Sequence, residues 1–503
     1  MNDFYAQYEE IVIKFEKQEK LLKETNQVVK ELKNIIKSLN NTIESQNKVI
    51  EEQALEILRL KTKNNKDSSN SSKPSGTNGY KKVITNRREK SNKKQGGQKN
   101  HPPHTLIKKL DQFMNSGDIE EEIIEINKNE ENKHKRYIEK KVIDIKVTKC
   151  IKIYRYYPDK SGKYHIPKYH NQYVQYGNNI KGIAMDLMIN LPNSTDGITT
   201  FINDITNGGI TLSKGTLINW EKELANKLSG DINKIEEELL DSYYLNHDES
   251  QFKIDSEGYN TLCACNELYV RLWSSKHKSQ KAIDEINFLP KFKGVIVKDG
   301  TELYNKYGCF LSQCISHIQR YLKGIYDFVN HKAPKKLSDF FTKYNNLRND
   351  YISSNIESFS DTELSNIISE YDNIIDEWEK ELRSDTNNYL FDDELKLFTR
   401  LKYDNKKMDR KIRGDRDEVL YFLKDFKVPS TNNNAESAQR GLKIKQKIGK
   451  FRSEEGADNY LTIKSCILTY KKQKLDVLKT ITDAFNGNLA LSEQKVSKNS
   501  LIL

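Results

Sequence analysis

The sequence predicts a multidomain α+β protein, with an N-terminal coiled coil and a later α/β core that an all-α segment interrupts. The length of 503 residues exceeds that of one ordinary domain. Apolar residues recur on a heptad near the amino terminus. Over residues 243–300, three strand patterns, a helical pattern and a further strand pattern follow one another.

The composition favours an anionic partner. Lys and Arg number 83 against 72 Asp and Glu, and this net charge of +11 is locally concentrated. Such an excess is typical of proteins that bind polyanions, although a solvated basic surface is the alternative. The six cysteines form no CxxC pair, so we expect no disulfide scaffold and no structural zinc. We find no signal peptide pattern and no apolar run of membrane-spanning length, and we therefore expect a cytoplasmic protein.

Residues 1–62 are expected to form a coiled-coil dimerisation helix. One heptad position carries only aliphatic residues, most of them β-branched: Leu22, Val29, Ile36, Ile43, Ile50 and Ile57. A repeat of this length favours a two-stranded coil, and β-branched residues at this position favour a parallel homodimer. Pairing of the helix within its own chain is the alternative.

The next two segments differ sharply in composition. Residues 63–109 are a basic, flexible linker rich in Ser, Asn, Lys and Arg. Such a segment buries too little to fold alone but can wrap a phosphate backbone, whereas a solvated linker is the alternative. Residues 110–172 alternate charged and β-branched residues, which predicts a small β-rich module.

Residues 173–240 have a helical pattern and are expected to form a DNA-binding region. A short helix, a Gly208-Gly209 turn, Ser213 as N-cap and a second helix follow one another, which is the outline of a helix-turn-helix. One face of the second helix carries Leu217, Trp220 and Leu224. An antiparallel helix pair that does not touch DNA gives the same pattern.

The strand patterns define an α/β core. YYLNHDESQFKI, YNTLCACN and ELYVRLW precede a helix in KSQKAIDEINFL and an almost continuous apolar strand in GVIVKDG. This order matches the first half of a ribonuclease-H-like fold, which we place at residues 241–328. Asp248 and Asp299 are expected to face each other, because open α/β sheets carry their chemistry at strand ends. An exposed turn is the alternative for Asp248.

A third carboxylate lies in the final part of the core, residues 429–480. Asn434 can cap a helix there, and Glu436 falls in its first turn, where attraction to the helix dipole is the alternative explanation. Three carboxylates suit two Mg²⁺ ions about 4 Å apart, an arrangement that cleaves phosphodiesters. The helix continues with a basic face on which DNA would lie: Arg440, Lys443, Lys445, Lys447 and Lys450.

More chain separates Asp299 from Glu436 than such a core needs. Residues 329–428 are charged and helical in pattern and are expected to form an all-α insertion, and residues 481–503 form a C-terminal tail. Cys314 and His317 have Cys-x-x-His spacing in QCISHIQR, but no second ligand pair accompanies them. We therefore interpret His317 and Arg320 as supporting or DNA-contacting residues, with simple packing as the alternative.

Several strings in one order resemble the transposases of the insertion sequence sixty-six (IS66) family. They include KKQGGQKNHPPHTL, YVQYGNNIKGIAMDLMINL, ITLSKGTLINW, HDES, GVIVKDG, QCISHIQR and NNNAESAQRGLKIKQKIGKFRSEEGA, and the similarity extends to about residue 475. The chain departs from the family in two places. Only Cys150 stands where members carry the paired cysteines of a zinc module, and Ser437 replaces the usual Arg after the catalytic Glu.

The resemblance implies a DDE transposase with a ribonuclease-H-like core. Asp248, Asp299 and Glu436 would be the catalytic residues and would ligate two Mg²⁺ ions, for which Mn²⁺ can substitute. The expected activity is metal-dependent cleavage at the element's ends and strand transfer of the 3′-hydroxyl into target DNA. A nucleoid-associated bacterial homodimer, assisted by accessory proteins of the same element, is implied as well. A catalytically inactive DNA-binding descendant and a nuclease-like scaffold acting on RNA are the alternatives.

Overall fold

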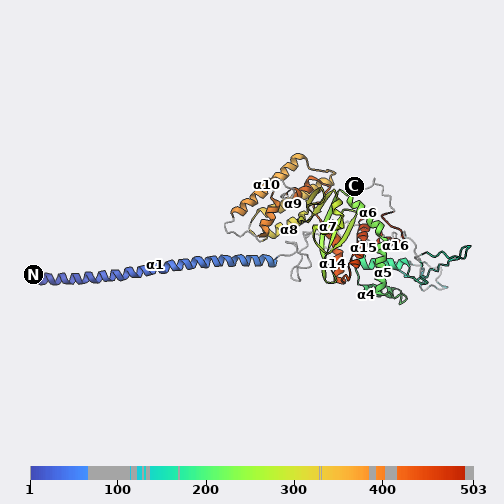
Figure 1. Cartoon of the computed structure of the whole chain (residues 1–503), viewed down its shortest axis with the longest axis horizontal. Helices are drawn as coiled ribbons and strands as arrows, with labels where there is room; N and C mark the ends of the chain where they lie inside the picture. The colour runs from blue at the N-terminus through green and yellow to red at the C-terminus, as the bar shows by residue number, and fades with distance from the viewer. Residues whose placement is uncertain are drawn as a thin grey trace. The chain divides into compact units, whose positions relative to one another are not determined.

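The computed structural model describes residues 2–65, 114, 122–126, 128, 130–131, 136, 138–167, 170, 172–327, 329, 331–384, 392–402 and 416–492. The fold is a mixed α+β fold with one five-stranded sheet and a long N-terminal helix, α1 (Asn2–Asn65), which Figure 1 shows as a single uninterrupted helix. Its heptad residues are exposed on the single chain, Ile36 by 56% and Ile43 by 52%.

The chain divides into two compact units. The first comprises Met1–Gly79, Leu240–Asp248 and Ser279–Ala435, and the second comprises Tyr80–Leu239, Glu249–Lys278 and Glu436–Leu503. Strand β1 (Tyr244–Ile254) and helix α14 (Asn433–Ile448) each contribute residues to both units.

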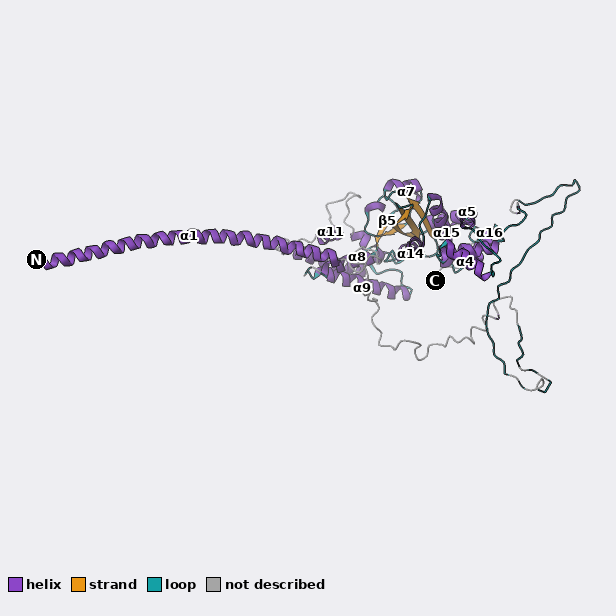
Figure 2. Cartoon of the chain, turned by 90° about the horizontal axis from the view of Figure 1, so that it is seen from below, coloured by secondary structure: helices purple, strands orange, loops and turns teal. Residues whose placement is uncertain are grey.

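The strands are hydrogen-bonded in the order β3-β2-β1-β4-β5 (strands in orange in Figure 2). Those of the expected core lie where the sequence predicts them: β1, β2 (Glu257–Cys265), β3 (Val270–Ser275) and, after α7 (Gln280–Ile286), β4 (Val295–Lys298). A further strand, β5 (Phe310–Gln313), was not among the predicted strands. β1 pairs with β4 and β4 pairs with β5 in parallel, whereas β2 and β3 are antiparallel.

In the first unit, helices pack around an aromatic and aliphatic core. These helices are α8 (Ile315–Tyr326), α9 (Ala333–Ser353), α10 (Asp361–Ser384), α11 (Asp392–Leu401), α12 (Arg416–Val419) and α13 (Tyr421–Lys424). Trp378 is fully buried in this core, and its Nε1 donates to Glu394 at 2.7 Å. Buried Arg348 donates to the backbone oxygens of Phe422, Phe426 and Val428 and so fixes the segment that leads to α14.

The second unit contains α3 (Asn178–Met185), η3 (Asp186–Asn190), α4 (Thr195–Ile205), α5 (Lys214–Lys227), α6 (Ser229–Leu240), α15 (Glu454–Lys472) and α16 (Val477–Phe485). α15 packs against β3, where the hydroxyls of Ser465 and Thr469 each accept a hydrogen bond of 3.0 Å from the backbone N–H of Leu272 and Val270. These side chains satisfy donors of an edge strand, which would otherwise offer a pairing surface.

The small β-rich module expected over residues 110–172 is not found in the described residues of that range, which contain no strand. Ile138, Val142 and Ile145 are 86%, 87% and 90% exposed, respectively. A strand needs a hydrogen-bonded neighbour and a buried face in addition to β-branched residues. Alternating composition alone therefore overstated the order of this segment. Of the basic linker expected over residues 63–109, residues 63–65 lie in α1 instead, and residues 66–109 lie outside the described residues.

Candidate active site

Asp248 lies in β1, and Asp299 directly follows β4, the parallel neighbour of β1. β1 pairs with β4 in the register Tyr244 to Val295, Leu245 to Ile296 and Asn246 to Val297. Continuing this register by two residues places Asp248 opposite Asp299, which directly follows the last residue of β4. Both carboxylates are partly exposed, whereas the residues before them are buried. The edge where β4 ends therefore presents two acidic side chains.

The residue after Asp248 has a different environment. The Glu249 side chain is only 6% exposed and forms an ion pair with Lys278, within the second unit. Successive residues of a strand point to opposite faces of the sheet. Glu249 is thus engaged in this ion pair and not at the strand edge beside Asp299.

The turn that carries Asp299 is held by hydrogen bonds. Asp299 Oδ1 accepts from the Thr301 backbone N–H at 2.9 Å, the pattern of an Asx turn. The preceding Lys298 is buried, and its Nζ donates to Thr301 O at 2.9 Å and to Asn305 Oδ1 at 2.6 Å. Glu418 of α12 lies 3.4 Å from the same ammonium group and compensates its buried charge.

His247, which immediately precedes Asp248, is also buried. Its ring lies 4.5 Å from the ring of Tyr304, centroid to centroid. Burial lowers the pKa of His247 to about 3, because the imidazolium form would lose its hydration. His247 is therefore neutral at physiological pH and acts as a packing residue beneath the carboxylate.

Buried amides tie the start of α14 to β1. Asn246 Nδ2 donates to the Thr431 backbone oxygen at 3.1 Å and to Asn432 Oδ1 at 3.0 Å. Asn432 Nδ2 donates in turn to the His247 backbone oxygen at 2.8 Å. Glu436 lies in the first turn of α14, as predicted. No sequence motif assigned a role to Asn246 or Asn432, since only Asn434 was considered, as a helix cap.

Cys314 supports the same segment. It is buried at the start of α8, and its Sγ accepts a hydrogen bond of 3.2 Å from the Asn432 backbone N–H. Ile315 N donates to Ser430 O at 3.0 Å. His317 and Arg320 follow on α8 and are partly exposed. Cys314 thus has an observed structural role, whereas a DNA contact by His317 or Arg320 stays a prediction.

The basic residues of the α14 segment do not share one environment. Arg440, Lys443, Lys447 and Lys450 are exposed. Lys445 is only 9% exposed, and its Nζ lies 5.8 Å from the centre of the Phe451 ring. Burial lowers the pKa of Lys445, and burial raises the pKa of nearby Glu221 to about 7. Lys445 therefore belongs to the interior of the second unit, in contrast to the exposed position expected of a DNA contact.

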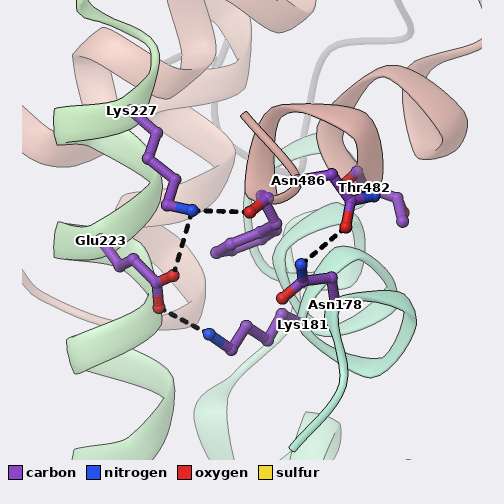
Figure 3. Close-up of polar contacts among 7 residues, drawn as sticks. Asn178, Lys181, Glu223, Lys227, Thr482 and Asn486 are labelled. Atoms are coloured by element: carbon purple, nitrogen blue, oxygen red, sulfur yellow. Dashed lines mark hydrogen bonds and ion pairs between the residues drawn. The ribbon is translucent and has the colours of Figure 1, made fainter. Parts of the chain in front are cut away.

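The predicted helix, turn and helix are present as α4, a turn and α5. The turn contains Asn207 and Gly208 at φ 48° and 72°, and Ser213 Oγ accepts from Thr216 N at 3.1 Å, which confirms it as the N-cap. Leu217, Trp220 and Leu224 are buried. On the polar side of α5, Glu223 pairs with Lys181 of α3 at 2.8 Å (Figure 3). Lys227 of the same helix donates to the backbone oxygen of Phe485 in α16 at 2.6 Å.

In a comparison with family models, residues 198–459 match the family described as Transposase IS66 family. This range is more than half of the chain and includes Asp248, Asp299 and Glu436. A search of curated proteins found no match. Among the described residues, no helix combines the length and the apolar character needed to cross a membrane.

Proposed function

Because the chain belongs to the IS66 family of transposases, we propose that it cuts DNA at the ends of an insertion sequence and joins the freed 3′-hydroxyl to target DNA. The catalytic residues are Asp248, Asp299 and Glu436. The observation that supports this proposal is the parallel register of β1 and β4, whose last pair, Asn246 and Val297, lies two residues before Asp248 and Asp299. The anchoring of Asn432 to β1 one residue before Asp248 supports the inclusion of Glu436, four residues further along the chain.

The donor set fits divalent metal ions, which DDE transposases generally use. Carboxylate oxygens are the ligands that Mg²⁺ prefers, and a phosphate and waters can complete its coordination. Asp248, Asp299 and Glu436 would hold two Mg²⁺ ions, and Mn²⁺ can substitute. Bound there, the ions supply charge stabilisation for the attacking and leaving oxygens of a phosphodiester.

The protein's own residues position the reacting groups. The Thr301 N–H fixes one oxygen of Asp299, and the Asn246–Asn432 pair fixes the start of α14 against β1. The exposed Arg440, Lys443 and Lys447 on α14, and Lys450 just after it, bind DNA phosphates, since exposed cations along one segment can follow a phosphate backbone. The α4–α5 pair docks on the element's end, and His317 and Arg320 support the bound strand.

The active assembly is a homodimer joined through α1. The exposed aliphatic heptad of α1 supports this arrangement, because a second helix would cover it. Two protomers would allow the two ends of an element to be processed together. Accessory proteins of the same element would assist the reaction.

Replacing Asp299 by Asn tests the activity directly. The amide keeps the size of the side chain but removes a negative ligand, so we expect loss of Mg²⁺-dependent cleavage and strand transfer with unchanged binding to end DNA. Glu302→Gln, a neutralisation at an exposed position three residues later, is the matched control and should cleave normally. Wild-type cleavage by Asp299→Asn would refute the assignment. A wild-type protein that binds ends without cleaving them would instead be an inactive descendant.

A further inference from the structure

An arginine from the helical insertion packs directly on the turn that carries Asp299. If Gly300 had a Cβ atom, that atom would lie 2.6 Å from Cζ of Arg400 and closer still to its Nη1. Gly300 is not among the glycines with positive φ. Space for the guanidinium group, rather than an unusual backbone conformation, therefore requires glycine at this position.

The helical core of the first unit holds Arg400 in place. Arg400 lies in the last turn of α11, between the buried residues Leu397 and Leu401. Tyr371 Oη donates to the Leu401 backbone oxygen at 3.0 Å, which fixes the end of the helix. The guanidinium Cζ also lies 5.7 Å from the centre of the Tyr321 ring on α8, within the range of a cation–π interaction. The Arg400 side chain is thus held against the Gly300 turn by the fixed end of α11 and by the Tyr321 ring.

The two cations at this turn have different surroundings. Lys298 is 2% exposed and its ammonium is surrounded by Thr301, Asn305 and Glu418, so it acts as a structural group. Arg400 lies beside the residue that follows Asp299 and is partly exposed, although two of its guanidinium nitrogens, Nε and Nη2, are buried. A guanidinium group stays protonated and offers several N–H donors in one plane, which suits phosphate oxygens.

We propose that Arg400 binds the non-bridging oxygens of the DNA phosphate that lies beside Asp299. The all-α insertion would then contribute a residue to the active site, and Gly300 would be the position that admits it. This inference rests on the proposed function, because it assigns Arg400 to the same DNA site. It adds a ligand-binding residue that none of the sequence motifs contains.

Binding to chemically modified DNA tests the contact without any need for turnover. Duplexes of the element's end would each carry one neutral methylphosphonate, scanned across the terminal phosphates. We expect the wild-type protein to lose affinity at the phosphate beside Asp299, and Arg400→Gln to bind the charged and neutral duplexes equally at that position. The slope of log K against log salt should fall by about 1 in the variant.

A matched variant controls for charge. Arg383 is exposed on α10 of the same insertion and pairs with Glu379 at 2.6 Å, so Arg383→Gln should behave as wild type. Circular dichroism and thermal unfolding would confirm that the variants are folded. A folded Arg400→Gln protein that keeps the full methylphosphonate penalty at every position would overturn the proposal.

Cleavage supplies a second readout. Loss of a donor to a reacting phosphate should lower the cleavage rate of bound DNA about a hundredfold in Arg400→Gln. Gly300→Ala should reproduce much of this loss, because its methyl group displaces the guanidinium. Full cleavage by both variants would contradict the inference while leaving the proposed function intact. Cleavage by Asp299→Asn would refute the proposed function. The methylphosphonate scan would then still decide whether Arg400 contacts a DNA phosphate.

Discussion

Asn432 Nδ2 donates a buried hydrogen bond to the backbone oxygen of His247 at 2.8 Å. The two residues are 185 positions apart in the chain. Asn246 Nδ2 donates a second hydrogen bond to Asn432 Oδ1 at 3.0 Å. The two side-chain amides therefore bind the segment before α14 to strand β1. Asp248 follows His247 directly. The two hydrogen bonds therefore fix the position of the start of α14 relative to the residue before Asp248.

Asn432→Ala should impair cleavage more than DNA binding. The substitution leaves the His247 carbonyl and the Asn246 amide without these partners, which should lower the free energy of unfolding by on the order of 2 kcal/mol. Misplacement of the helix start should reduce the cleavage rate at least tenfold. Urea unfolding and a cleavage time course would measure the two effects. The exposed neighbour Asn433 provides the control. Equal losses of stability and of cleavage rate in Asn432→Ala and Asn433→Ala would contradict a positioning role for the Asn432 hydrogen bonds.

Two lysines of α14 should respond differently to neutralisation. Lys443 is exposed, so Lys443→Gln should lower the slope of log K against log salt for end DNA by about 1. Lys445 is buried over Phe451, so Lys445→Met should leave the slope unchanged. Fluorescence anisotropy titrations at several salt concentrations would give both slopes. A smaller slope in Lys445→Met would mean that Lys445 reaches DNA after all.

Glu221 should make the stability of the second unit depend on pH. Burial raises its pKa from 4.5 to about 7, so between these values the folded state holds a proton that the unfolded state has lost. Stability therefore falls as the pH rises through this window, by on the order of 3 kcal/mol for a pKa raised from 4.5 to about 7.

Urea unfolding of Glu221→Gln at pH 5 and pH 8 would test this expectation. The variant cannot ionise at this position and should lose that part of the pH dependence. Glu237→Gln, at an exposed position on α6, should retain the wild-type behaviour. An unchanged pH dependence in Glu221→Gln would show that Glu221 does not titrate in this range.

A charge in the heptad should dissociate the proposed dimer. Ile36→Asp combined with Ile43→Asp places carboxylates at two positions of the seam, where a coiled coil would have to bury them. Sedimentation equilibrium should show a monomer, whereas Asn41→Asp, on the outer face of the same helix, should remain dimeric. A wild-type protein that sediments as a monomer would contradict dimerisation through α1.

Helices and strands were largely predictable from the sequence where the pattern of neighbouring residues determines the local structure. The strands β1 to β4, the Ser213 cap and the position of Glu436 in a first helical turn depend on residues close in sequence, and the structure agrees with them. The expectation that Asp248 and Asp299 face each other required one further rule, that open α/β sheets carry their chemistry at strand ends. The strands predicted within residues 110–172 are absent from the described residues of that range, because alternation cannot reveal whether a strand has a neighbour.

The sequence by itself therefore indicated the order of most elements and the family to which the chain belongs. Only the tertiary structure decided that Lys445 is buried while its neighbours on α14 are exposed, that Asn432 is bonded to β1, and that Arg400 packs on Gly300. Helical and strand periodicity are set by neighbours a few residues away. These other features depend on the close approach of segments far apart in the chain, where desolvation and hydrogen bonding select which side chains meet.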